Sequence, residues 1–195
     1  MTEFIAENPD ADKDDNKAIL PIDESPRYLS LDAAFLSDAQ IVLDALRTDS
    51  EPLSHSDLTR LHLNSQAVME GFSFPEELPV ILTSAQSYFP VGRKYPVNPF
   101  ALILAIREAE KVGAGLEFVV MHPKAKDTKL RTQCEWACGT VEKNFQRFST
   151  QTQEGDFITF LGKRYAPIGA ENDLLELNQH WVGNVKSFYR KYSEK

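Results

Sequence analysis

Two glutamates, Glu108 and Glu110, stand where an apolar segment of the chain turns polar. Glu110 follows Ile106 by four residues and Ile103 by seven, so in a helix it lies on the same face as these two isoleucines. A carboxyl group at the end of a core-facing stripe loses part of its hydration, which raises its pKa and suits it to act as a general acid. The alternative is that the helix reaches the surface at Arg107 and that both glutamates are solvated.

The helix that would position this carboxyl group runs from Asn98 to Gly113. Asn98 is a favourable N-cap, and Pro99 occupies the first helical position, where its missing N–H costs nothing. Gly113 is placed at the position just after the last helical residue, where glycine commonly ends a helix. Residues 100–106 are apolar on nearly every side, which predicts a buried helix.

Hydrophobic periodicity predicts further helices on both sides of this one. They are expected at residues 37–49, 56–70, 128–148, 157–164 and 173–192. Residues 78–84 fit a short strand or a helical turn equally well. Residues 116–122 form the most strand-like run, and Pro123 ends it. The predicted fold class is therefore mainly α, with one short β excursion directly after the helix at 98–113.

The acidity of the chain is concentrated at its N-terminus. The first 24 residues hold eight acidic residues against two lysines, a net of −6, so the rest carries only −2 of the total −8. We expect residues 1–26 to be an acidic flexible leader that binds a protein partner, followed by a helical region at 27–97 and a helical domain at 98–195. The body lacks the basic patch that nucleic-acid binding requires.

Several functional classes are disfavoured by missing patterns. No apolar run approaches the roughly 20 residues of a membrane span. The N-terminus has neither the basic start nor the apolar core of a signal peptide, so synthesis in the cytoplasm is expected. The chain has no P-loop, dinucleotide fingerprint, HExxH or CxxC motif, and no cofactor is expected.

The histidines and cysteines do not suggest a metal site. No two histidines have ligand spacing on one predicted element; they are His55, His62, His122 and His180. Cys134 and Cys138 share a helix face and fit small buried residues better than ligands or nucleophiles. Carboxylates are therefore the groups left to do chemistry.

Cleavage of a glycosidic bond can begin with a single glutamate of raised pKa that protonates the leaving oxygen. A second carboxylate then holds a water, or the substrate's own groups attack and no second carboxylate is needed. The segment Ala105-Ile-Arg-Glu-Ala-Glu110 resembles the Ala-Ile-x-x-x-Glu signature of lysozyme-like lytic transglycosylases and goose-type lysozymes. In this resemblance Glu110 falls on the family's acid.

The resemblance extends over residues 98–192. Residues 116–121 stand where the family has a Gly-Leu-Met-Gln strand, and residues 157–167 resemble its later helices. The segment from Asn172 to Val185 resembles the closing part of small lysozyme-like proteins from phages and bacteria. The resemblance therefore implies a lysozyme-like helical domain.

The function that the resemblance implies is cleavage of peptidoglycan glycan strands by a glycosidase or lytic transglycosylase. Glu110 would be the acid/base, and Tyr165 would support the developing oxocarbenium or orient the substrate. Glu117 and Asn172 would be secondary contacts in the groove. Without a signal peptide, the enzyme would reach the cell wall by a phage or secretion route.

Two alternatives remain open. Lys111-Val112-Gly113 follows Glu110 where the family has Ser-Gly, and the glycine and glutamine of the family's strand are missing. These departures favour a non-catalytic structural or binding protein of the same fold, linked to a virion or a secretion apparatus. The third possibility is an all-helical cytoplasmic protein unrelated to lysozymes.

Overall fold

The computed structural model describes residues 29–30, 42, 44, 53–89, 93–110, 117–118, 129–150, 155–170, 173 and 176–194. Predictions for the leader at 1–26, for Gly113 and for Asn172 lie outside the described residues, and so does most of the helix expected at 37–49.

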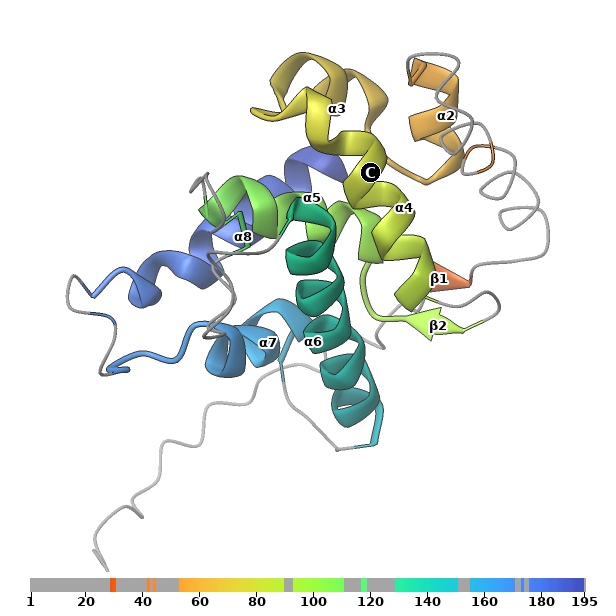
Figure 1. The fold of residues 1–195 in the computed structure, drawn as a ribbon. Coiled ribbons are helices and arrows are strands. Elements are labelled where there is room, and N and C mark those ends of the chain that lie inside the picture. The colour runs from red at the N-terminus through yellow and green to blue at the C-terminus, as the bar shows by residue number, and fades with distance from the viewer. Residues whose placement is uncertain are drawn as a thin grey trace, which may run out of the picture.

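The described structure is mainly helical, which confirms the predicted fold class (Figure 1). The elements are β1 (Leu29–Ser30), α2 (His55–Arg60), α3 (Ser65–Gly71), the short 3-10 helix η1 (Pro75–Glu77), α4 (Leu78–Tyr88), β2 (Lys94–Tyr95), α5 (Pro99–Glu110), α6 (Leu130–Thr150), α7 (Phe157–Tyr165) and α8 (Asn178–Tyr192). None of the described helices is both long and apolar enough to cross a membrane.

The short β element differs in position from the one that the sequence predicts. β1 pairs with β2 as antiparallel strands, with Leu29 opposite Tyr95 and Ser30 opposite Lys94. Glu117 and Phe118, inside the predicted strand, form a turn instead. The strand pairing joins segments more than 60 residues apart, so local alternation of residue types does not reveal it.

The single helix predicted at residues 56–70 is wrong, because the chain breaks between α2 and α3. His62 has a positive φ of 52°, and Asn64 begins α3 by accepting a hydrogen bond from the N–H of Ala67 at 3.2 Å. The residues left ambiguous at 78–84 belong to α4, which has a proline in its first turn. Proline is tolerated there because the first N–H groups of a helix have no partner inside it.

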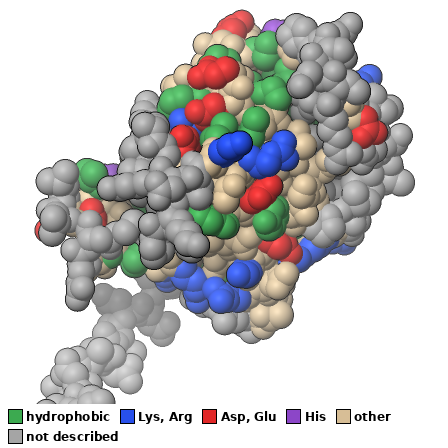
Figure 2. Space-filling model, viewed as in Figure 1, with side chains coloured by type: hydrophobic (Ala, Val, Ile, Leu, Met, Phe, Trp, Pro, Cys, Tyr) green, Lys and Arg blue, Asp and Glu red, His purple; other side chains and the backbone are tan. Residues whose placement is uncertain are grey.

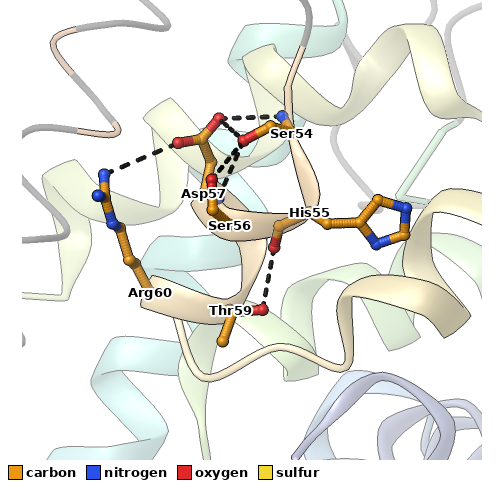
Figure 3. A network of polar contacts seen from close by, with 6 residues as sticks. All are labelled: Ser54, His55, Ser56, Asp57, Thr59 and Arg60. Carbon is orange, nitrogen blue, oxygen red and sulfur yellow. Dashed lines mark hydrogen bonds and ion pairs between the residues drawn. The ribbon is translucent and has the colours of Figure 1, made fainter.

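Helix α2 is short and depends on its cap (Figure 3). The hydroxyl of Ser54 accepts a hydrogen bond from the N–H of Asp57, and the Asp57 carboxylate accepts one from the N–H of Ser54. This reciprocal pair is a capping box. Arg60 lies 4.0 Å from the same carboxylate, one turn further on. Side-chain hydrogen bonds therefore stabilise the start of this six-residue helix.

Helix α5 is the buried centre that the sequence predicts. All its residues from 99 to 108 are buried, and it packs against α8 and α4. The side-chain oxygen Oδ1 of Asn98 accepts hydrogen bonds from the N–H groups of Phe100 and Ala101, as expected of an N-cap. Its amide group also donates to the backbone carbonyls of Leu61 and His62, at 3.0 and 2.9 Å. Asn98 thus joins the start of α5 to the break between α2 and α3.

Replacing Asn98 with alanine is expected to cost about 2–3 kcal/mol of unfolding free energy. The substitution removes the cap, worth about 1 kcal/mol, and leaves buried carbonyl groups short of donors, at about 1–2 kcal/mol more. Urea unfolding followed by circular dichroism measures the loss. Asn64→Ala is the matched control, because it removes the exposed cap of α3 alone and should cost about 1 kcal/mol. Equal losses in the two variants would contradict a joining role for Asn98.

The core crosses the boundary at residue 98 between the two predicted regions. Phe89 and Tyr95, which precede that boundary, pack against Phe145 of α6, with ring centroids 5.9 and 4.9 Å apart. Phe145 stacks in turn on Phe157 of α7 at 4.2 Å. The described helices on both sides therefore share one hydrophobic core. That shared core holds α7 and α8 in place beside the end of α5.

Two smaller features of the described residues agree with the sequence. Cys134 and Cys138 are both buried, with sulfur atoms 3.9 Å apart, as small apolar residues of the core. The face in Figure 2 carries acidic and basic side chains together, with Lys and Arg gathered near its lower edge. The mixed signs on this face fit a body of low net charge.

Candidate functional site

A pocket lies between the end of α5 and the first half of α8, and Glu110 forms part of its wall. Its volume is about 820 Å³, within the range of roughly 300–1,000 Å³ that is usual for small-molecule sites. The lining residues are Ala109, Glu110, Asp173, Leu177, Asn178, Gln179, His180, Trp181, Gly183 and Asn184. Apart from two residues of α5, all of them belong to α8 or to the segment just before it. The described part of the lining therefore comes from the end of α5, from α8 and from the segment before α8.

Glu110 is held from α8 by a direct hydrogen bond. The indole N–H of Trp181 donates to Oε1 of Glu110 at 2.8 Å. Trp181 is only 6% exposed, so its ring belongs to the core while its N–H faces the pocket wall. Because an indole N–H can only donate, this bond favours the ionised carboxylate.

Burial nevertheless dominates the acidity of Glu110. Loss of hydration raises its pKa from the ordinary 4.5 to about 7. The Trp181 hydrogen bond and the positive charge of Arg107 act in the opposite direction, but they offset only part of this effect. Near neutral pH the group is therefore divided between its protonated and ionised forms, which suits a residue that must give and accept a proton.

Tyr165 lies beside this pair but does not line the pocket. Its ring stacks on Trp181, with centroids 5.1 Å apart and planes 23° from parallel. Its hydroxyl donates to the backbone carbonyl of Phe118 at 2.9 Å. Burial, followed by the negative charge of Glu110, raises the pKa of Tyr165, so the hydroxyl stays protonated and keeps donating. The predicted substrate contact through Tyr165 stays a prediction, and its observed contacts are with Trp181 and Phe118.

The two charged residues just before Glu110 are structural. Arg107 is 1% exposed and donates to both oxygens of Glu77, from Nε at 2.6 Å and from Nη2 at 2.9 Å. Glu108 is 2% exposed and accepts hydrogen bonds from the N–H and the hydroxyl of Ser73, at 2.9 and 2.5 Å. The alternative that α5 reaches the surface at Arg107 is therefore wrong. Of the two glutamates, Glu110 lines the pocket described above and Glu108 does not.

The structure does not show the other two predicted substrate contacts, Glu117 and Asn172, together with Glu110 at the pocket. Glu117 lies in the turn before Phe118 and is not among the lining residues, and Asn172 lies outside the described residues. Asp173, the next residue, does line the pocket. Its two carboxylate oxygens accept hydrogen bonds from the N–H groups of Leu177 and Asn178, at 2.8 and 2.9 Å. The helix predicted to begin at residue 173 begins instead at Asn178, with Leu177 as its N-cap, so Asp173 supports the start of α8 from outside the helix.

The sequence pattern did not reveal Trp181 as a partner of the acid. Its spacing from Leu177 and Val185 predicts a core residue, which is correct but incomplete. The polar neighbours His180 and Asn184 lie on nearly the same side of α8 and also line the pocket. A tryptophan on a helix next to such polar residues is the sequence signal that could have indicated a site residue here.

In the described part of the chain, no three His, Cys, Asp or Glu side chains are grouped so that they could hold a metal ion. Among the lining residues that the structure describes, two are carboxylates, one is a histidine, three carry side-chain amides and none is a lysine or arginine. Comparisons with family models, curated proteins and solved structures found no match for this chain. The site must therefore be interpreted from its own chemistry.

Proposed function

We propose that this protein cleaves the glycan strands of peptidoglycan, as a glycosidase or lytic transglycosylase, with Glu110 as the acid/base. The observation that carries this proposal is a glutamate with a pKa near 7 on the wall of a pocket. Such a group is still partly protonated at neutral pH, as a general acid must be. The resemblance of residues 105–110 to the lysozyme-like signature supports the same assignment.

The first step is proton transfer from Glu110 to the glycosidic oxygen. The bond between that oxygen and the anomeric carbon breaks, the leaving sugar departs as an alcohol, and an oxocarbenium-like centre develops. A hydroxyl of the same sugar chain, or a water, then attacks the anomeric carbon. Glu110, now ionised, accepts the proton of the attacking group and returns to its starting state.

The second carboxylate in the pocket lining supports attack by the substrate's own hydroxyl. Asp173 already accepts two backbone N–H groups at the start of α8. These bonds fix its orientation and reduce its capacity to hold a nucleophilic water. A mechanism that needs only one mobile proton carrier fits this arrangement better than one with two carboxylates.

The remaining lining residues suit an uncharged sugar chain. Asn178, Gln179 and Asn184 offer amide donors and acceptors of the kind that sugar hydroxyl and acetamido groups require. Leu177, which is 62% exposed, offers an apolar surface, and the lining residues that the structure describes include no Lys or Arg to attract an anion. Pockets of this kind bind ligands through a few oriented polar groups on an apolar wall.

Filling the pocket from Gly183 tests whether it is the reaction site. A Cβ atom at Gly183 would meet nothing within 4 Å, so a side chain there extends into open space. We expect Gly183→Phe to slow the release of soluble glycan from purified cell-wall sacculi at least tenfold with the fold intact. Gly183→Ala adds a single methyl group and should keep at least half of the activity. Equal activity of the phenylalanine variant and the parent would place the reaction elsewhere.

The alternative of a non-catalytic binding protein is favoured by the sequence after Glu110, where Lys111-Val112-Gly113 replaces the family's Ser-Gly. It predicts that the parent protein sediments with sacculi but releases no glycan from them. The acidic leader at 1–26 would then be the arm that binds a protein partner in a virion or secretion apparatus.

A further inference from the structure

We infer that Trp181 is the positioning residue for Glu110, and that Tyr165 acts through Trp181 instead of contacting the substrate. The kinetic part of this inference rests on the proposed function, whereas the structural part concerns Glu110 alone. It assigns Tyr165 a role different from the substrate contact that the family resemblance implies.

A continuous series of contacts leads to the carboxyl group from the turn at Phe118. The Tyr165 hydroxyl donates to the Phe118 carbonyl, the Tyr165 ring stacks on Trp181, and Trp181 donates to Glu110. The turn, α7, α8 and α5 each contribute one member. Phe118 is fully buried, so the series begins in the core.

The Trp181 ring is also fixed by the backbone of α7. A Cβ atom at Gly162 would lie 3.3 Å from Cε3 of Trp181 and would overlap the side chain of Val182. Glycine therefore allows α7 to lie directly against this part of α8. With Tyr165 stacked on it and Gly162 close to its edge, the indole has little freedom to turn its N–H away from Glu110.

The hydrogen bond selects which oxygen of Glu110 does the chemistry. Oε1 accepts the indole N–H, so Oε2 is the oxygen that carries the transferred proton. Fixing the carboxyl group in this way keeps its proton aimed at one point in the pocket, and orientation of this kind contributes strongly to rate. The same bond stabilises the ionised form and limits the rise in pKa that burial causes.

Other charged and titratable groups face Glu110 and must be kept constant in a test. Arg107 lies on the same helix, Tyr165 is on α7, and Asp173 and His180 share the pocket lining. Trp181→Phe leaves all four in place. It removes the N–H while keeping an aromatic ring for Tyr165 to stack on.

The direct test is a ¹³C NMR titration of the Glu110 carboxyl group in carboxyl-labelled protein, with Glu110→Gln identifying the signal. We expect Trp181→Phe to raise the Glu110 pKa by about one unit, because a hydrogen bond to the charged form is lost. Tyr165→Phe, which loses only the bond to Phe118, should shift it in the same direction by less. Tyr189→Phe is the control, since its hydroxyl bonds to the N–H of Asn98 at the other end of α5, and it should leave the pKa unchanged.

The kinetic readout is the pH profile of glycan release from sacculi. Trp181→Phe should move the alkaline limb upward with the pKa and lower kcat about 10- to 100-fold with little change in KM. An unchanged Glu110 pKa in Trp181→Phe would overturn the inference, even if thermal stability fell. A parent protein without activity would overturn the proposed function instead, and the titration would still decide the role of Trp181.

Discussion

Glu110→Gln is expected to reduce the release of glycan from sacculi by at least 10²- to 10³-fold. Glutamine has nearly the same shape and can still accept the Trp181 N–H through its amide oxygen, but it cannot deliver a proton. Turbidity loss of purified sacculi, compared at equal protein concentration, measures the change. The control is Glu108→Gln, because Glu108 bonds to Ser73 away from the pocket. The control variant should be less stable, yet its folded molecules should remain active.

The same Glu110 substitution is expected to stabilise the fold at alkaline pH. The folded-state pKa of Glu110 is raised from 4.5 to about 7, so the parent loses stability as pH rises through this interval. Below pH 4.5 the Glu110 carboxyl is protonated in both the folded and the unfolded protein. The parent and the variant should therefore have similar unfolding free energies there. At pH 8 the parent must hold an ionised Glu110 in a buried position, which costs on the order of 3 kcal/mol of unfolding free energy. The neutral glutamine avoids this cost. A variant that is less stable than the parent at pH 8 would contradict the burial assigned to Glu110.

Glu77→Gln is expected to cost about 3 kcal/mol of unfolding free energy, the largest loss among these variants. Arg107 is almost fully buried, and removing the charge of its bidentate partner weakens the pairing of a guanidinium that lacks water. Arg107 also lies over the Phe74 ring at 3.5 Å, so the damage should extend into η1 and the end of α3. Chemical denaturation at neutral pH measures the loss.

An exposed ion pair supplies the control for Glu77→Gln. Lys186 contacts Asp156 at 2.7 Å, but the two side chains are 30% and 51% exposed. Lys186→Ala should therefore cost less than about 1 kcal/mol. Equal losses of unfolding free energy in Glu77→Gln and Lys186→Ala would contradict the claim that burial of Arg107 makes the loss of its partner costly.

The central helix was predictable because its signals are local. Asn98 and Pro99 define its start, and an apolar surface on every side allows only a buried position. The break between α2 and α3 was not predictable from the local pattern. It depends on the positive φ of His62 and on hydrogen bonds from Asn98, which is 36 residues away. Local periodicity continues through such a break, so it suggests one helix.

The candidate site was predictable in part for the same reason. Glu110 follows the buried stripe of Ile103 and Ile106, and the structure places it on the wall of a pocket. Trp181 follows an equally regular stripe on α8, and this stripe predicts only that its ring is buried. Its N–H meets Glu110 because α8 packs against α5, and a contact between residues 71 positions apart leaves no trace in either periodic pattern.

The most direct test of the account is mass spectrometry of the soluble products that the parent and Glu110→Gln release from purified sacculi at about pH 6. At this pH most Glu110 carboxyl groups hold their proton. We expect the parent to release glycan fragments cut at glycosidic bonds, with a cyclic end group if the substrate's own hydroxyl attacks, and the variant to release none above background. No glycan fragments from the parent, or the same fragments from Glu110→Gln, would contradict the assignment of Glu110 as the acid of a glycan-cleaving enzyme.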